Sequence, residues 1–113
     1  MESTPQRITR LQIGIIVLTI ATAAIHLILA FIVPEVRTLF ILNALGYLAL
    51  LAAYFLPQFA RYHNAVRWLL IAFAAVTIIG FFVVNGVKVD PIGWLTKAIE
   101  IALIVLLWMD GRN

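Results

Sequence analysis

The chain has 113 residues, of which 65% are hydrophobic and 12% are charged, and it contains no cysteine. Soluble domains are about 45–50% apolar, so this composition excludes an ordinary soluble protein, and the missing thiols exclude disulfides and thiolate metal sites. The net charge of +3 does not indicate a nucleic-acid partner, because the eight basic residues are scattered at the ends of apolar runs instead of being clustered.

Four apolar runs follow one another along the chain, and each approaches the roughly 20 residues that a membrane-spanning helix needs. Pro34 and Pro57 end the first two runs, while Asp90 and Pro91 supply an N-cap and an N1 proline for the fourth. Short loops make sequential helices antiparallel, so we expect an all-α protein, an up-down four-helix transmembrane bundle in one integral membrane domain, residues 1–113. The expected spans are residues 11–33, 36–56, 65–84 and 92–109.

The first run also has features of a signal peptide. Arg7 and Arg10 precede an apolar stretch that contains the small residues Ala21-Thr22-Ala23, which imitate a cleavage site. The apolar run continues ten residues past Ala23 to Val33, so we expect a retained span.

The basic residues predict the orientation in a cell membrane, because cytoplasmic loops carry an excess of Lys and Arg. One side is flanked by five arginines, Arg7, Arg10, Arg61, Arg67 and Arg112, and the other only by Arg37 and Lys88. We therefore expect a multi-pass protein with both termini in the cytoplasm. Interfacial anchors are expected at Tyr54, Tyr62, Trp68 and Trp108 on the inner side and at Phe31, Phe40 and Trp94 on the outer side.

Glu100 lies near the middle of the fourth span, with Lys97 three residues before it. Ionisable residues are rare inside membrane spans and usually mark an interior, a paired charge or a pathway. Helical rise places the other polar residues of the spans within about 10 Å of Glu100 along the axis. The predicted intramembrane polar layer therefore consists of Glu100, Lys97, His26, Asn43, Thr77 and Tyr47.

Helical spacing also predicts that these residues face the interior. Gln12, Thr19, Thr22 and His26 form one stripe, and Asn43, Tyr47 and Tyr54 form another. Hydrogen bonds between packed helices explain such a layer completely, and Lys97 can pair with Glu100 on the surface of their own helix. For Asn43, Thr77 and Thr22 this structural interpretation is favoured. His26 leaves both interpretations open, since imidazole titrates near neutral pH and suits proton handling.

No cofactor, metal site or enzymatic activity is predicted. His63 lies some 20 Å of helical rise from His26, so one chain cannot ligate one haem with both. We interpret His63 as an interfacial loop residue. Hydrolase, nucleotide-binding and metalloprotease motifs are absent from the sequence, and its one serine is Ser3.

Small residues spaced four apart favour close helix contacts, as at Ala49 and Ala53 or at Ala98 and Ala102. A single copy has little interior to offer a solute. Besides the lipid bilayer, the expected partners are therefore a second copy, forming a homodimer, or a larger membrane complex.

The chain resembles a family of small, uncharacterised four-span bacterial integral membrane proteins, to which no function is assigned. The resemblance continues through Arg67 and the Lys97 to Glu100 pair. It rests on His26-Leu27, Pro34, Leu39-Phe40, Leu42-Asn43, Gly46-Tyr47-Leu48 and Tyr54-Phe55-Leu56-Pro57. In size and span number the chain is also similar to small multidrug exporters and fluoride channels, but it lacks the exporters' first-span glutamate and the channels' Gly-Asn and Thr-rich signature.

Three functions stay open at this point. The favoured one is a non-catalytic accessory or structural subunit of a membrane complex. The alternative is a small dimeric transporter or channel in which Glu100 binds a proton or cation, Lys97 tunes it, and His26 and Asn43 complete the site. The third is a haem- or quinone-associated membrane redox protein.

Overall fold

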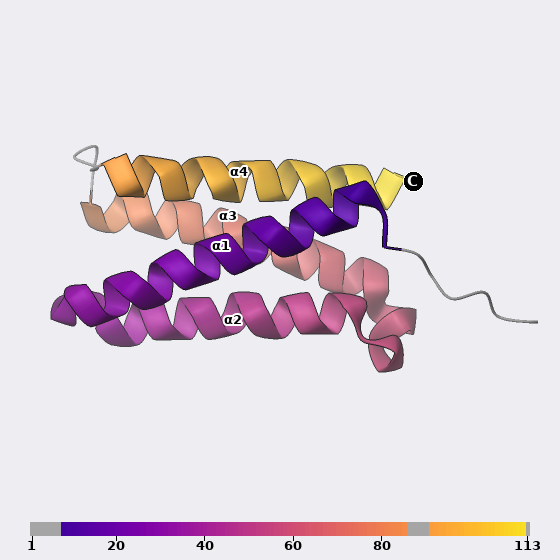
Figure 1. Cartoon of the computed structure of the whole chain (residues 1–113), viewed down its shortest axis with the longest axis horizontal. Coiled ribbons are helices and arrows are strands. Elements are labelled where there is room, and N and C mark those ends of the chain that lie inside the picture. The colour runs from indigo at the N-terminus through magenta and orange to yellow at the C-terminus, as the bar shows by residue number, and fades with distance from the viewer. Residues whose placement is uncertain (1–7, 86–90, 113) are drawn as a thin grey trace, which may run out of the picture.

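The computed structural model describes residues 8–85 and 91–112 (Figure 1). Within these ranges the α helices are α1 (Arg10–Ile32), α2 (Arg37–Phe55), α3 (His63–Asn85) and α4 (Pro91–Arg112). Two short 3-10 helices, η1 (Pro34–Val36) and η2 (Pro57–Tyr62), precede α2 and α3. All four α helices are long and apolar enough to cross a membrane, which confirms the all-α class and the expected number of apolar helices in the described parts of the chain.

The helix ends follow local chemistry. The Thr9 hydroxyl accepts a hydrogen bond from the Gln12 backbone N–H, and the Gln12 side chain accepts one from the Thr9 backbone N–H, so a capping box begins α1. Pro34 and Pro57 each begin a 3-10 helix, because proline fits the first turn of a helix. The predicted N-cap at Asp90 lies outside the described residues.

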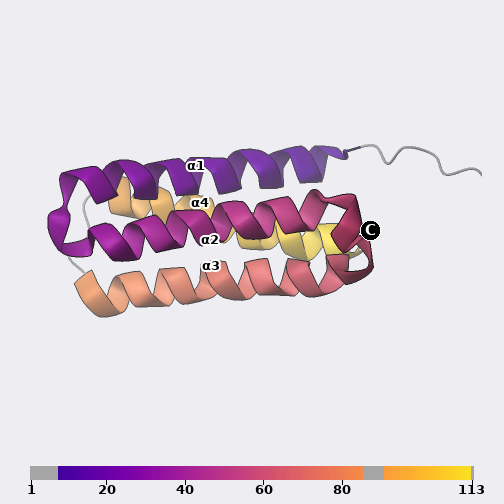
Figure 2. The ribbon, with the colours of Figure 1, turned by 90° about the horizontal axis from the view of Figure 1, so that it is seen from below.

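Each helix packs against two others (Figure 2). Helix α1 contacts α2 and α4, and α3 contacts the same two helices. Fully buried apolar side chains between them include Ile15, Leu70, Leu103 and Leu107. This arrangement places one face of every helix along a shared interior, where the polar stripes of the sequence also lie.

The small residues at the helix contacts differ from the predicted ones. Ala49, Ala98 and Ala102 are exposed, so the helices of one chain do not meet there. Gly46 does lie at a contact, because a Cβ atom at this position would overlap the ring of Phe73 on α3. The actual close approaches depend on which small residue happens to face a bulky partner, and four-residue spacing alone does not identify that.

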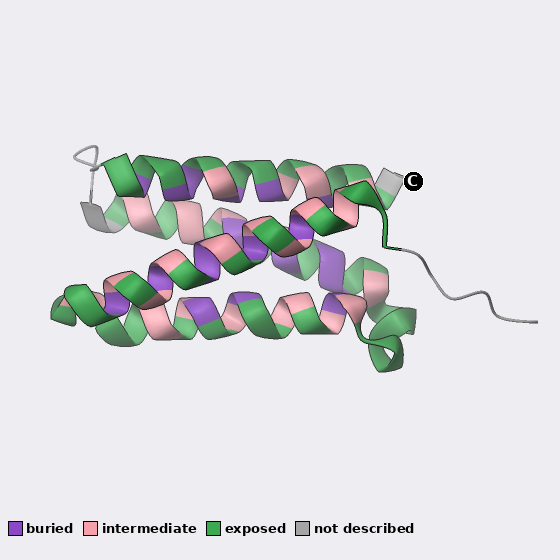
Figure 3. Ribbon diagram, viewed as in Figure 1, coloured by how far each residue is buried: buried purple, intermediate pink, exposed green. Residues whose placement is uncertain are grey.

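The outer surface carries many large apolar side chains. Figure 3 shows that exposed positions occur along all four α helices. In the apolar part of residues 34–55 only 17% of the residues are buried, and in residues 57–83 only 22%. Soluble monomers rarely expose apolar patches of more than a few hundred Å², so this surface requires lipid or another apolar partner. Examples on α2 and α3 are Leu39, Leu42, Leu45, Val76, Ile79 and Val83.

The contact at Gly46 gives a first prediction. Gly46→Ala forces the Phe73 ring away from Tyr47, whose ring it meets edge to face at 4.8 Å between centroids. We expect a loss of about 1–3 kcal/mol in the free energy of unfolding, measured by denaturant titration in detergent. Gly80→Ala is the matched control, because no described atom lies within 4 Å of a Cβ atom there. Equal effects of the two substitutions would contradict the proposed close packing at Gly46.

Candidate functional site

Glu100 and Lys97 form a buried ion pair one turn apart on α4. The Lys97 ammonium contacts the Glu100 carboxylate at Oε1. Their side chains are 2% and 0% exposed, respectively. The pair therefore does not lie on the helix surface, as one interpretation of the sequence suggested, but inside the bundle. Two opposite charges in such a place stabilise each other strongly, since removing either one leaves an uncompensated buried charge.

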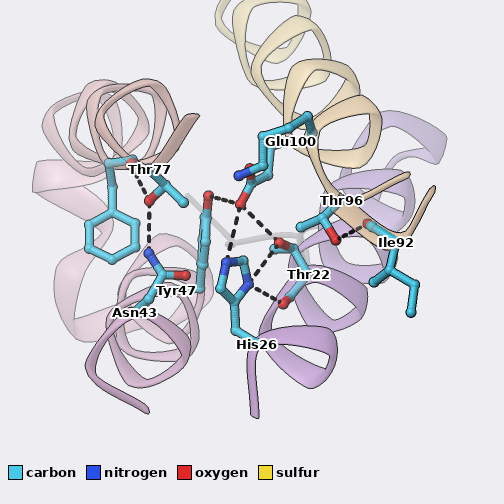
Figure 4. Close-up of polar contacts among 10 residues, drawn as sticks. Thr22, His26, Asn43, Tyr47, Thr77, Ile92, Thr96 and Glu100 are labelled. Carbon is cyan, nitrogen blue, oxygen red and sulfur yellow. Dashed lines mark hydrogen bonds and ion pairs between the residues drawn. The ribbon is translucent and has the colours of Figure 1, made fainter. Parts of the chain in front are cut away.

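The second carboxylate oxygen of Glu100 joins α4 to two other helices (Figure 4). Oε2 accepts hydrogen bonds from the hydroxyl of Thr22 on α1 and from the hydroxyl of Tyr47 on α2, each at 3.0 Å. Hydrogen bonds to an ionised acceptor are shorter and stronger than neutral ones. One carboxylate thus links three helices, with two hydrogen bonds on Oε2 and an ion pair at Oε1.

His26 lies beside this carboxylate and points one ring nitrogen at it. Its Nδ1 lies 2.7 Å from the backbone oxygen of Thr22, and a carbonyl only accepts, so the Nδ1 proton is donated there. Nε2 lies 4.0 Å from Oε2 of Glu100. In the neutral ring this nitrogen presents a lone pair to the carboxylate, and a second proton would create an ion pair. Phe40, expected to be an outer anchor, is instead half-buried and packs edge-on against the His26 ring at 5.3 Å.

Asn43 and Thr77 form a neighbouring link between α2 and α3. The Asn43 amide donates to the Thr77 hydroxyl at 2.8 Å, and this hydroxyl donates to the backbone oxygen of Phe73 at 2.8 Å. The Asn43 side-chain oxygen is buried and has no hydrogen-bond partner in the described part of the chain. The predicted polar layer is therefore split: Glu100, Lys97, Tyr47 and His26 meet directly, and Asn43 and Thr77 pair beside them.

Helix α3 contributes an aromatic face to the charged pair. The Lys97 ammonium lies 4.6 Å from the centroid of the Phe81 ring. A cation over an aromatic face is attracted by the ring quadrupole, and the attraction is worth more where water is excluded. The Phe81 ring thus replaces part of the stabilisation that the Lys97 ammonium loses when it is removed from water.

A second polar cluster, which sequence analysis missed, surrounds Asp110 near the end of α4. The Asp110 carboxylate accepts hydrogen bonds from the Tyr54 hydroxyl and from the Gln12 amide, the latter at 3.4 Å. Nε2 of His63 lies 3.9 Å from the same oxygen. We call Asp110, Tyr54, Gln12 and His63 the Asp110 cluster. Its signal in the sequence is that all four residues lie at the same end of their apolar runs.

Two predictions about this end of the bundle are wrong. Tyr54 is not an interfacial anchor but is 2% exposed. His63 is not a loop residue: it begins α3, stacks on the Tyr54 ring at 4.0 Å between centroids, and hydrogen-bonds the Tyr54 backbone oxygen through Nδ1 at 2.9 Å. Polar side chains near a helix end can turn inwards when a carboxylate on another helix accepts their hydrogen bonds or pairs with them. Here the Asp110 carboxylate has this role for Tyr54 and His63.

Arg67 is also buried, although it was expected to flank the membrane. Its Nη1 donates to the backbone oxygen of Leu107 at 3.3 Å, and Nε and Nη2 donate to Asn64 at 3.3 and 2.8 Å. The residue is 7% exposed. Because Leu107 lies in the last turns of α4, the guanidinium also interacts favourably with the negative end of that helix.

The two histidines lie in different clusters, His26 with Glu100 and His63 with Asp110. Among the described residues no group of three or more His, Cys, Asp or Glu side chains is placed to hold a metal ion. The central cluster offers charge pairing, hydrogen bonding and an imidazole nitrogen that can take up a proton.

Substitution of Tyr47 measures the strength of its hydrogen bond to the Glu100 carboxylate. Tyr47→Phe removes one charge-assisted hydrogen bond and should lower the free energy of unfolding by about 1–2 kcal/mol, measured by denaturant titration in detergent. In the Glu100→Gln background the same change should cost at least about 0.5 kcal/mol less, because the ionised acceptor is gone. Tyr62→Phe, at a half-exposed ring, is the control. An identical cost of Tyr47→Phe in both backgrounds would contradict the assigned contact.

Comparison of the chain with protein-family models, curated proteins and solved structures finds no match. The resemblance to small four-span bacterial membrane proteins therefore stays a prediction. What the protein does has to be argued from the geometry of its two polar clusters and from the character of its surface.

Proposed function

We propose that this protein is a small multi-pass membrane protein, an up-down four-helix transmembrane bundle that serves as a non-catalytic accessory or structural subunit of a membrane complex. The observation that carries the proposal is the closed state of the central ion pair. Glu100 is fully buried, and its carboxylate pairs with the Lys97 ammonium and accepts hydrogen bonds from Thr22 and Tyr47. Such a group fixes helices in place.

The burial of Glu100 weighs against transport as the main function. A carboxylate that carries a proton or cation across a membrane has to exchange it with water, and its partners have to release it in turn. Here the competing cation is Lys97, which belongs to the same helix and is itself only 2% exposed. Intramembrane charges that pair with one another inside a bundle offset the free-energy cost of their burial. Such a pair needs no water-filled pathway.

The outer surface supports the choice of an accessory subunit. The helices bury a minority of their apolar residues, least of all along α2, so most of the bundle faces away from its own interior. Lipid covers part of such a surface. A homodimer or a larger membrane complex would cover more of it, and the exposed alanines on α2 and α4 leave those faces smooth enough for close helix contact.

The basic residues support a cytoplasmic position for both termini. Arg10, at the start of α1, and Arg61 and Arg67, at the turn into α3, lie at the same end of the bundle as the last turn of α4. The opposite end has Arg37, whose side chain donates to the backbone oxygen of Ala30 at 2.9 Å. By the positive-inside rule the first end faces the cytoplasm.

A small proton or cation transporter is the second candidate, and one observation favours it. Nε2 of His26 lies 4.0 Å from Glu100, and a proton can be added to it without breaking a described hydrogen bond. Protonation there would make two cations share one carboxylate and would loosen the pair with Lys97. Protonation of His26 would thus be coupled to release of Lys97 from Glu100, and a transporter needs coupling of this kind.

Substitutions of Glu100 and Lys97 test the proposed structural role of their ion pair. Glu100→Gln or Lys97→Met alone should lower the free energy of unfolding by about 3–5 kcal/mol, because each leaves an unpaired buried charge. The double variant Glu100→Gln, Lys97→Met should regain most of that stability and retain the partners that copurify with the tagged protein in mild detergent. The measurements are denaturant titration and native gel mobility.

Proteoliposomes separate the two candidates. With an internal pH dye and an imposed potential, the wild-type protein should leave the proton leak at the level of protein-free vesicles. Thr96→Val is the matched control, since Thr96 is buried beside the pair and its described hydrogen bond stays within its own helix, to the Ile92 backbone oxygen. A proton flux that the double variant abolishes and Thr96→Val retains would overturn the accessory-subunit proposal in favour of the transporter.

A further inference from the structure

A cavity of about 170 Å³ lies between α3 and α4 at the end of the bundle that holds the Asp110 cluster. It is lined by Arg67, Trp68, Trp108 and Gly111. The volume is that of several water molecules. The cavity is open on its outer side, where Trp68 and Trp108 are 45% and 49% exposed.

Arg67 is a buried cation that lines this cavity, and among the described residues no carboxylate forms an ion pair with it. Arg67 is 93% removed from solvent, and no carboxylate oxygen of the described residues lies within 4 Å of its guanidinium. A guanidinium has five N–H donors, and the described hydrogen bonds to Asn64 and Leu107 use three of them. Two donors and a full positive charge are therefore available to an anion in the cavity.

The nearest acidic residue of α4 does not serve this purpose. The Asp110 carboxylate is engaged by Tyr54 and Gln12 through hydrogen bonds and by His63 at 3.9 Å, and no ion pair with Arg67 is described. Its side chain is only 6% exposed. Burying an unpaired charge is costly, so the position of Arg67 is explained if an anion from outside the chain completes it.

The cavity walls fit an anion that arrives from the membrane. The Trp68 and Trp108 rings meet edge to face at 5.7 Å, and the Arg67 guanidinium lies 4.7 Å from the Trp68 ring. Tryptophan concentrates at the level of lipid headgroups because its ring is apolar and its N–H is polar. Arginine matches phosphate oxygens with two parallel N–H donors.

We propose that this cavity binds the phosphate of an anionic phospholipid headgroup, with Arg67 as the phosphate ligand and the two tryptophans flanking the lipid. The proposal rests on the membrane insertion argued above but not on the accessory role. It adds to that role a specific lipid site on the basic side of the bundle, where anionic lipids are attracted. The same phosphate chemistry could be met by free inorganic phosphate, and the experiment distinguishes the two.

The test uses the full chain purified in an uncharged detergent. Short-chain phosphatidylglycerol, phosphatidylcholine or inorganic phosphate is titrated while tryptophan fluorescence and the unfolding temperature are followed. Phosphatidylglycerol should quench or shift the fluorescence saturably and raise the unfolding temperature, and phosphatidylcholine and inorganic phosphate should not. Arg67→Gln should weaken the apparent affinity for phosphatidylglycerol about tenfold or more, because the bidentate charged contact is lost.

Arg61→Gln is the matched control, since it removes the same charge from an exposed position six residues away. It should change the affinity less than about threefold. If Arg67→Gln does not fold, Gly111→Leu replaces it: a side chain at position 111 would overlap the guanidinium and fill the cavity while the charge is retained. This variant should lose phosphatidylglycerol binding to the same extent.

Three results would overturn the site. The first is an equal loss for Arg61→Gln and Arg67→Gln, which would indicate general surface charge. The second is unchanged binding in Gly111→Leu. The third is a full effect of inorganic phosphate alone, which would assign the cavity to a free anion. Flotation of the protein with vesicles is measured in parallel, so that failure of membrane insertion is distinguished from failure of the lipid site.

Discussion

The desolvated carboxylate of Glu100 is the constraint on which the arrangement of the helices depends. An ionised group without water needs a compensating charge and hydrogen-bond donors, and here Lys97 supplies the charge and Thr22 and Tyr47 supply the donors. Lys97 belongs to the same helix and fixes only its own rotamer. Thr22 and Tyr47 belong to α1 and α2, so their contacts fix the rotation and axial position of both helices relative to α4. A shift of either helix by one residue would move its hydroxyl away from the carboxylate, at the cost of a buried unpaired oxygen.

Helix α3 is attached by a different set of contacts, none of the described ones being a hydrogen bond to Glu100. Phe73 packs at Gly46 and against Tyr47, Thr77 pairs with Asn43, and Arg67 bonds to the end of α4. These contacts are spread along α3, and two further ones meet charged groups of α4: Phe81 lies against the Lys97 ammonium, and His63 lies 3.9 Å from the Asp110 carboxylate. Steric fit at Gly46 therefore adds to these polar contacts in fixing α3.

The sequence predicts the coarse structure well because hydropathy and periodicity are local properties. Run lengths predict four apolar helices, and the 3.6-residue stripe predicts that Thr19, Thr22 and His26 are buried, as they are. The stripe of Asn43, Tyr47 and Tyr54 also predicts the inward position of Tyr54. Pairing is not local. Nothing in the spacing tells that Asn43 pairs with Thr77, or that Arg67 turns inwards instead of extending to the headgroups. Asp110 was missed because a polar residue at the end of a span is ordinarily solvated, and only the position of Tyr54 on another helix reveals that this one is enclosed.

The two polar clusters are separated by an apolar layer, and this separation divides their roles. On α4, Leu103 and Leu107 lie between Glu100 and Asp110, and both are fully buried together with Ile15 of α1. Water at the Asp110 cluster, where the His63 side chain is 40% exposed, therefore meets hydrocarbon before it meets Glu100. The central cluster is closed, because Glu100 is fully buried and Lys97 is 2% exposed, whereas the basic end keeps a half-exposed imidazole. In the described part of the chain, exchange with molecules outside the chain is therefore easier at that end, where a titratable group is accessible.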